Sequence, residues 1–348
     1  DALEEEYGEK RGRELLERYG DAFGSGYREA YGVAQTLIDI TQIEQVLATG
    51  EIGMSLYRRP GTPRSKIHFM VYHPDRPIPL SDVLPLFEHM GFRVIDESPN
   101  NVVFGKEDNR EVMIHDFGLE SKDGSDVDPD GIRDHFQDAF RRVWLGETES
   151  DGFNALVPFA GMTWREVVIL RAYSKYLRQA GIAFSQAYME QTLANNGALA
   201  QLIVDLFMTL FDPAQAKGRE ARKKRLKGRL ARGLDAVVSA DEDRILRRFL
   251  NVVDSTLRTN FFQTAADGGP KGYLSLKLDS KAIDELPLPR PLREIFVYSP
   301  RVEGVHLRFG LVARGGLRWS DRREDFRTEI LGLVKAQQVK NAVIVPVG

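Results

Sequence analysis

The chain is organised around the stretch Ala313-Arg-Gly-Gly-Leu-Arg-Trp-Ser-Asp-Arg-Arg-Glu-Asp-Phe-Arg327, which leads toward Val345-Pro-Val-Gly348. Apolar residues that alternate from Val305 to Val312 predict a strand before this stretch. A helix of about 17 residues is expected after it, followed by a second apolar strand from Ala342 to Val347. We expect these elements to belong to one domain that starts near residue 268.

The turn in this stretch combines two glycines with two arginines. Gly315 and Gly316 let the backbone take positive φ and come close to a ligand. Arg314 and Arg318 flank that bare backbone with planar guanidinium groups, whose shape suits a carboxylate or a phosphate. The turn is therefore a candidate site for an anion.

The helix after the turn has one lysine on its inward side. We expect a capping box of Asp321 and Glu324 to open this helix, so that its positive dipole end lies near the arginines and favours an anion. Lys340 falls on the inward side, whereas Lys335 lies opposite. An inward lysine either pairs with a buried anion, such as a substrate carboxylate, or extends to water at the helix end, and helix geometry leaves both open. The inward side is formed by Phe326, Ile330, Leu333, Val334 and Gln337.

Composition places the chain among globular proteins. Its 348 residues are 42% hydrophobic and 28% charged, which predicts roughly two or three domains. The net charge of -3 gives no electrostatic reason to expect nucleic-acid binding, and the absence of cysteine excludes disulfides and thiolate metal sites. Because no apolar run reaches the about 18 residues of a membrane span, we expect a cytoplasmic protein. The missing initiator Met and the end directly after a strand suggest a segment of a larger polypeptide.

Four segments are expected along the chain. Residues 1–50 show helical spacing and form a helical connector, and residues 51–125 predict an antiparallel sheet. Residues 126–266 are mostly helical, and residues 267–348 begin the last domain. The fold class is therefore α+β and multidomain.

The sheet of residues 51–125 carries one helix that Ser81 caps and Gly91 ends. Its pattern resembles the ACT-like fold, a small amino-acid-sensing module, and a structural spacer is the alternative. No pair of its histidines has metal-ligand spacing, so no metal site is expected. The expected strands are those around 54–56, 67–71, 92–95, 102–104 and 112–117.

In the helical segment, capping boxes are expected at Thr163 with Glu166 and at Ser239 with Glu242. The second of them is expected to open a helix through about Phe262 that turns Leu257 inward. A basic run from Lys217 to Arg232 contains no aromatic residue that could stack on a base, so an exposed helix is the simpler interpretation.

The acidic run Asp126-x-Asp128-x-Asp130-Gly131 invites comparison with a calcium-binding loop. Such a loop needs an acidic residue at its twelfth position, which is Gln137 here. A solvated linker before a helix is therefore expected instead.

Three stretches resemble the opening of the catalytic domain of glutamate dehydrogenases. They are Arg314-Gly-Gly-Leu-Arg318, Lys335-Ala-Gln-Gln-Val-Lys340-Asn and Val345-Pro-Val-Gly348. The longer run from Gly315 to Glu329 is similar in particular to the large bacterial NAD-specific glutamate dehydrogenases. The resemblance implies that residues 267–348 begin an α/β substrate-binding domain.

The resemblance also implies an activity and a set of site residues. Members of the family deaminate L-glutamate to 2-oxoglutarate and ammonium and pass a hydride to NAD⁺. Lys340 matches the lysine that holds the substrate α-carboxylate, and Lys335 is the alternative. Arg314 stands where smaller members carry a lysine for the side-chain carboxylate, so Arg314 or Arg318 could hold that group beside Gly315 and Gly316.

The catalytic residues and the NAD site are expected outside this sequence. The catalytic lysine of the family follows the Val-Pro-Val-Gly strand, and the sequence ends at Gly348. No Gly-x-Gly-x-x-Gly follows a strand anywhere in the chain, so no nicotinamide site is expected in it. We therefore expect the chain to be inactive alone.

A second hypothesis is a self-contained scaffold that senses an amino acid or mediates oligomerisation without catalysis. The expected partners are glutamate or 2-oxoglutarate, an amino-acid effector at the ACT-like module and further copies of the chain in a homo-oligomer. Neither nucleic acid nor a membrane is expected as a partner.

Overall fold

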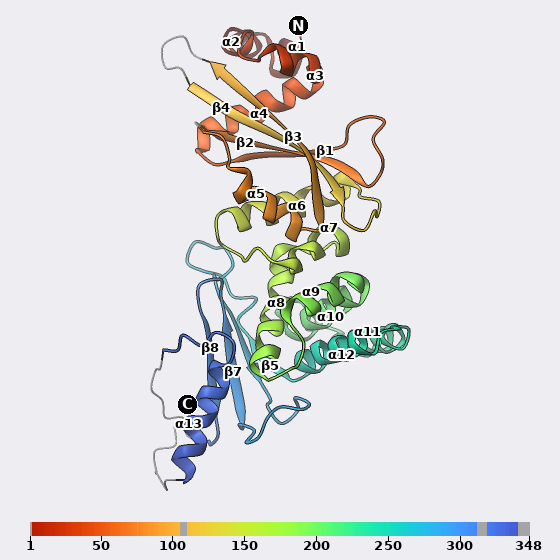
Figure 1. Cartoon of the computed structure of the whole chain (residues 1–348), viewed down its shortest axis with the longest axis vertical. Coiled ribbons are helices and arrows are strands. Elements are labelled where there is room, and N and C mark those ends of the chain that lie inside the picture. The colour runs from red at the N-terminus through yellow and green to blue at the C-terminus, as the bar shows by residue number, and fades with distance from the viewer. Residues whose placement is uncertain (1, 75, 105–109, 312–318, 340–348) are drawn as a thin grey trace. The chain divides into compact units, whose positions relative to one another are not determined.

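The computed structural model describes residues 2–74, 76–104, 110–311 and 319–339. The chain divides into two compact units, residues 1–141 and residues 142–348, and each unit is described by itself. Helices and a four-stranded antiparallel sheet occur in both units, which confirms the expected α+β class (Figure 1).

The first unit has a sheet with the strand order β1-β2-β4-β3, in which every neighbouring pair is antiparallel. The strands are β1 (Gly53–Tyr57), β2 (Lys66–Pro74), β3 (Phe92–Phe104) and β4 (Arg110–Ser121). The helices are α1 (Ala2–Tyr7), α2 (Glu9–Tyr19), α3 (Ser25–Ala30), α4 (Val33–Thr49), α5 (Leu80–His89) and α6 (Pro129–Trp144). The predicted helices before residue 50 and the predicted sheet after it are both confirmed.

Strand β2 is buried on both of its faces. On one face the ring of Phe69 lies 5.6 Å from that of Phe87 on α5, and 5.2 and 5.0 Å from those of Phe136 and Phe140 on α6. On the other face Met70 and Tyr72 belong to a cluster with buried side chains of α2, α3 and α4. The alternation seen in the sequence therefore marks a central strand between two layers of helices.

Two expectations for this sheet were wrong in detail. The stretches 92–95 and 102–104 are not separate strands, because β3 is continuous over 13 residues and contains Pro99. Proline is tolerated there because β3 lies at the edge of the sheet, where a missing N–H breaks no ladder. Helix α5 begins at Leu80 after Pro79, so Ser81 is not its cap, whereas Gly91 does take the expected positive φ of 86°.

A buried carboxylate connects several segments of this unit. Asp116 on β4 is 1% exposed and accepts hydrogen bonds from the hydroxyls of Tyr31 and Tyr57, at 2.8 and 2.7 Å. Arg59 donates to the same carboxylate at 2.6 Å, and the His68 ring lies 3.2 Å from its other oxygen. Burial raises the pKa of Asp116, but the bonds to His68 and Tyr57 outweigh it and lower the pKa. The carboxylate thus holds the loop before α4 against the sheet.

The second unit begins with helices that the sequence predicts well. Thr163 and Glu166 form the expected reciprocal capping box, and Asp212-Pro213 ends the buried helix α10. The basic run forms α11, which buries Leu226, Leu230 and Leu234 and exposes most of its charged side chains. The segments before the sheet are η1 (Gly152–Ala155), α7 (Leu156–Ala160), α8 (Trp164–Gln179), α9 (Gln186–Asn195), α10 (Gly197–Phe211), η2 (Pro213–Gln215), α11 (Arg219–Leu234) and α12 (Ala240–Asp254).

Helix α12 is shorter than expected. Ser239 accepts from the backbone of Glu242, but the Glu242 side chain bonds to Asn195 and Asn196 instead of closing a capping box. The helix ends at Asp254, and the next residues form β5 (Thr256–Thr259). Leu257 therefore lies on a strand and is 46% exposed, because the strand pairs with β6 and turns this side chain outward.

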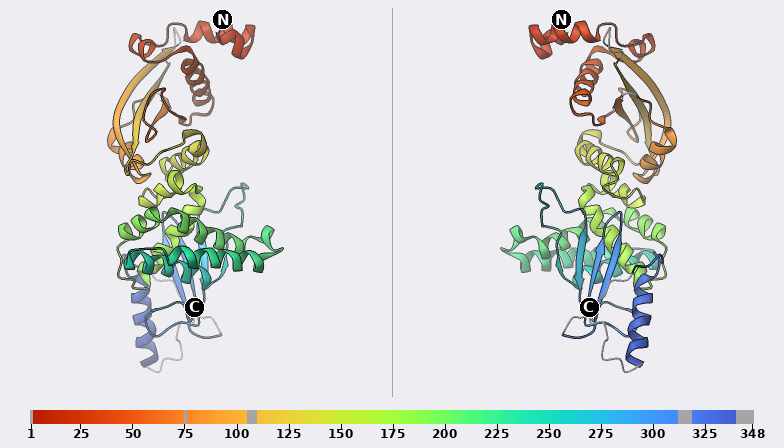
Figure 2. Two further views of the ribbon diagram at one scale, coloured as in Figure 1. Left: turned by 90° about the vertical axis from the view of Figure 1, so that its right-hand side faces the viewer. Right: turned by 90° about the vertical axis from the view of Figure 1, so that its left-hand side faces the viewer.

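The second sheet has the order β5-β6-β7-β8 and is antiparallel throughout. Its further strands are β6 (Leu274–Leu278), β7 (Arg293–Tyr298) and β8 (Glu303–Arg308), and the prolines at 287, 289 and 291 lie in the expected connection. Helix α8 packs on β6 and β7, and α13 (Phe326–Val339) lies beside β8 and α8 (Figure 2). The boundaries expected at residues 126 and 267 stay predictions.

Within the part of the chain that the structure describes, no single helix is long and apolar enough to cross a membrane. Helices α9 and α10 reach that length only together, and the chain bends by 98° between them.

We expect Phe69→Ala to destabilise the first unit by about 3–5 kcal/mol, because the substitution leaves a cavity among three aromatic rings. The free energy of opening, measured by native-state hydrogen exchange of the β2 amides, reports the change. Ile95→Ala on the edge strand is the control, since Ile95 is 48% exposed and should cost less than about 0.5 kcal/mol. Equal losses in the two variants would contradict the proposed core.

Candidate functional site

The site residues expected from the sequence lie outside the described residues. Arg314, Gly315, Gly316 and Arg318 fall in the segment 312–318, and Lys340 falls in the segment 340–348. Their roles stay predictions. Lys335, the alternative to Lys340, is an exposed residue of α13.

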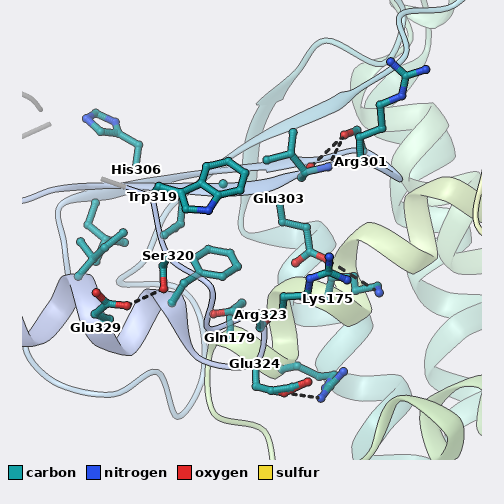
Figure 3. Close-up of a pocket in the computed structure, with 18 of the residues that line it drawn as sticks. Lys175, Gln179, Arg301, Glu303, His306, Trp319, Ser320, Arg323, Glu324 and Glu329 are labelled. Carbon is teal, nitrogen blue, oxygen red and sulfur yellow. Dashed lines mark hydrogen bonds and ion pairs between the residues drawn. The ribbon is translucent and has the colours of Figure 1, made fainter. Parts of the chain in front are cut away.

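The described residues of the second unit enclose a cavity of about 910 Å³. Its volume falls within the roughly 300–1,000 Å³ that is usual for small-molecule sites. It is formed by α8, the turn from β7 to β8, strand β8, residues 319–324 and the first turns of α13 (Figure 3). Trp319, the residue after Arg318, lines it, so the described cavity adjoins the predicted anion site along the chain.

One wall of the cavity is charged because helix α8 turns two cations toward it. Lys175 and Arg178 stand one turn apart on α8. The Lys175 ammonium lies 3.1 Å from a Glu149 carboxylate oxygen and 3.8 Å from one of Glu303, and Arg178 lies 3.7 Å from Glu324. Figure 3 shows Lys175 and Glu303 pointing toward one another. An anion that entered here would compete with Glu303 for Lys175.

Burial affects the titration of Glu303 in this wall. Burial raises its pKa, the ammonium of Lys175 opposes this effect, and the nearby Glu149 adds to it. The Glu303 side chain is 22% exposed. The ion pair with Lys175 therefore stabilises the Glu303 carboxylate, although burial removes part of the hydration of that carboxylate.

A buried arginine on α8 holds Glu149 in place. Arg171, one turn before Lys175, is 0% exposed and forms two hydrogen bonds of 2.7 Å with the Asp151 carboxylate. It also donates to Thr148 at 3.1 Å and to Asn154 at 2.6 Å. These bonds fix residues 148–154 against α8 and bring Glu149 to the cavity.

The opposite wall is largely apolar and comes from α13. Phe326, Ile330, Leu333 and Val334 line the cavity, so most of the predicted inward side does face it. Lys335 does not line the cavity.

The start of α13 differs from the prediction. The helix begins at Phe326, so Asp321 and Glu324 do not form a capping box. Residues 323–325 instead form a turn, and Ser320 accepts from the Arg322 backbone at 3.1 Å and donates to Glu329 at 2.7 Å.

The charged residues that α8 and α13 contribute were not predicted from the sequence. Arg171, Lys175 and Arg178 recur at spacings of four and three within a helix that is otherwise mostly buried, and this pattern is a readable signal for a charged wall. Arg327 on α13 is 1% exposed and pairs with Glu294 on β7. The sequence contains no local signal for this pair, because 33 residues separate its members.

Four family models match the chain. The model of the bacterial NAD-glutamate dehydrogenase catalytic domain matches residues 229–348. Models described as glutamate dehydrogenase helical motif 3, ACT3 domain and helical motif 2 match residues 148–213, 51–132 and 2–46. These matches agree with the expected ACT-like sheet, helical middle region and beginning of a catalytic domain.

Three curated relatives are named NAD-specific glutamate dehydrogenase. The protein of Halomonas elongata is 45% identical over 344 residues, and that of Pseudomonas aeruginosa is 46% identical over 347 residues. Each alignment covers 99% of this chain and 21% of the relative. The protein of Mycobacterium tuberculosis is 46% identical over 339 residues, which cover 95% of this chain and 20% of the relative. The chain thus spans about a fifth of the length of these proteins.

We expect Glu303→Gln to stabilise the second unit at pH 7.5. The pKa of Glu303 is raised in the folded state, so protonation of this side chain favours folding. The stabilisation is fully present below the unfolded pKa of 4.5 and is lost as the pH rises through the folded pKa. The increase in the free energy of unfolding caused by Glu303→Gln should therefore shrink as the pH falls to 4.5. Urea denaturation of both proteins at pH 7.5 and pH 4.5 measures this difference.

Glu324→Gln is the matched control for this experiment, because Glu324 also lines the cavity but its side chain is 72% exposed. A loss of stability in Glu303→Gln at pH 7.5 would contradict the expectation, since the ion pair with Lys175 would then outweigh the cost of burial.

Proposed function

Because the chain belongs to the bacterial NAD-glutamate dehydrogenase family, we propose that it is part of an enzyme that oxidatively deaminates L-glutamate. The reaction converts L-glutamate, NAD⁺ and water to 2-oxoglutarate, ammonium, NADH and a proton. The observation that carries the proposal is the match of residues 229–348 to the catalytic-domain model. Within the enzyme, residues 1–266 supply a helical connector, an ACT-like module and a helical domain, and residues 267–348 begin the substrate-binding domain.

Lys340 is the proposed ligand of the substrate α-carboxylate. Leu333 lines the cavity, and at 100° per residue the position seven residues later lies within about 20° of it on the helix. The helical period of the sequence therefore predicts Lys340 on the same side as Leu333. Lys335 is exposed and is absent from the cavity lining, which favours Lys340 over it.

Arg314 and Arg318 are the proposed ligands of the side-chain carboxylate. A guanidinium can bind both oxygens of a carboxylate at once. Gly315 and Gly316 between them let the backbone approach the same group. Support comes from Trp319, which follows Arg318 directly and lines the cavity.

NAD and the catalytic lysine belong to other parts of the proposed enzyme. The chain contains no Gly-rich dinucleotide fingerprint and spans about a fifth of the length of the named relatives. The chain alone should therefore produce no NADH from glutamate and NAD⁺. NADH formation by the purified chain, followed by absorbance, would contradict this proposal.

The proposed enzyme is cytoplasmic.

The ACT-like sheet supports a second proposal, that an amino acid binds to this module as an effector and that copies of the chain associate. The match of residues 51–132 to an ACT3 model favours it. Titration calorimetry of the 348-residue chain with individual amino acids tests the effector, and light scattering tests the association. Absence of heat with all amino acids would exclude an effector on this chain.

We expect Lys340→Ala in the full-length enzyme to raise the KM for glutamate about 10- to 100-fold with the fold intact. A hydrogen bond to a charged group contributes about 1.5–3 kcal/mol, and about 1.4 kcal/mol corresponds to a factor of ten. Steady-state kinetics with glutamate as the varied substrate measure the change, and circular dichroism checks the fold. Lys335→Ala is the discriminating variant, since a rise in KM there and not in Lys340→Ala would move the role to Lys335.

A further inference from the structure

Arg327 and Glu294 form an ion pair that is buried between helix α13 and strand β7. Arg327 lies in the first turn of α13 and is 1% exposed, and Glu294 is 0% exposed. The guanidinium Nε donates to Glu294 Oε2 at 2.9 Å, and one terminal nitrogen donates to Oε1. Tyr176 on α8 donates to the same carboxylate at 3.1 Å. The carboxylate is thus held by three donors from two helices.

Gln179 attaches the start of α13 to α8 through the backbone. Its side-chain oxygen accepts from the Arg327 N–H at 3.1 Å, and its side-chain nitrogen donates to the Arg323 carbonyl at 2.7 Å. Gln179 itself is 3% exposed. The first turn of α13 is therefore bound to β7 by a side chain and to α8 by its own backbone.

Stability alone does not require this ion pair. Replacing a buried ion pair by apolar side chains of similar volume is often neutral or stabilising, because two charges no longer lose their hydration. The pair does restrict geometry, since a guanidinium that binds both carboxylate oxygens has one orientation. A rotation or shift of α13 would leave two buried charges unpaired, and so the pair selects one position of the helix.

The position of the first turn determines where the rest of the helix lies. The 14 residues of α13 span about 21 Å at 1.5 Å per residue. A tilt of about 10° at the first turn would move the far end of the helix by about 4 Å. Misplacement of a substrate-binding group by about 1 Å can reduce a reaction rate about 100-fold. Small changes at Arg327 are thus amplified at the other end.

We infer that Arg327 and Glu294 are positioning residues, which set the orientation of α13 and thereby act on the proposed substrate-binding residue that follows Val339 along the chain. The inference rests on the proposed function, in which that residue is Lys340. The pair touches no substrate and acts through the helix. Tyr176 and Gln179 complete the arrangement.

The test replaces the whole buried polar group in the full-length enzyme. The variant Arg327→Met/Glu294→Leu/Tyr176→Phe leaves no charge or hydroxyl unpaired, so it should fold with a Tm close to that of the unchanged enzyme. We expect the KM for glutamate to rise about 10-fold or more, with the KM for NAD⁺ unchanged. A purely structural pair predicts an unchanged KM for both substrates, and that result in a folded variant would overturn the inference.

Combination with Lys340→Ala shows whether the pair acts through that lysine. If it does, an enzyme with the triple replacement and Lys340→Ala together should have nearly the same KM as Lys340→Ala alone. If the two changes act independently, their fold-increases in KM should multiply. Multiplied effects would overturn the inference. If Lys340→Ala alone leaves the KM unchanged, the proposed substrate role fails and the inference fails with it. If only the triple replacement has no effect, the inference fails and the substrate role stands.

Two further variants keep the test decisive. Arg327→Lys retains the charge but cannot bind both carboxylate oxygens, and we expect it to raise the KM for glutamate at least about 3-fold. Should the triple replacement fail to fold, Arg327→Lys provides the test in its place. An unchanged KM for glutamate in Arg327→Lys would then overturn the inference. Arg293→Met is the control on the same strand, because Arg293 pairs with Asp279 at 3.1 Å and not with a residue of α13, and this variant should leave the KM unchanged.

Discussion

The second unit depends on the requirement that buried charges have partners. Arg171 and Arg327 are nearly inaccessible to water, and each binds a carboxylate with two nitrogens. An unpaired charge in either place would cost several kcal/mol, so the segments that supply the partners must come together. The two arginines thereby fix the walls of the cavity, one through residues 148–154 and the other through α13.

Much of the fold could be predicted from the sequence because it is encoded locally. The capping box at Thr163 and the left-handed turn at Gly91 need only neighbouring residues, and both are present. The strand at 67–71 was recognisable from its alternation. Local patterns failed where a distant partner decides the structure: the pairing with β6 ends α12 at Asp254, and the pairing with β4 makes β3 continuous through Pro99.

The cavity was less predictable than the fold. Its charged wall combines Glu149, Lys175 and Glu303, which three separate segments contribute. Only the spacing of the cations on α8 was visible in the sequence, and nothing local connected them to Glu303. The predicted glycines and arginines were recognised as an anion site from their residue types, and the resemblance to a family added their expected substrate role, but neither indicated how the fold joins them to the cavity.

The double-sided burial of β2 bears on how the N-terminal part of the chain can be divided. Met70, Tyr72 and Ile114 pack against side chains from α2, α3 and α4, and Tyr31 just before α4 bonds to Asp116. A protein cut at residue 51 would expose an apolar sheet face and leave Asp116 with fewer donors. The helices before residue 50 are thus one half of the core around the sheet, and the smallest piece that keeps this sheet covered on both faces begins with them.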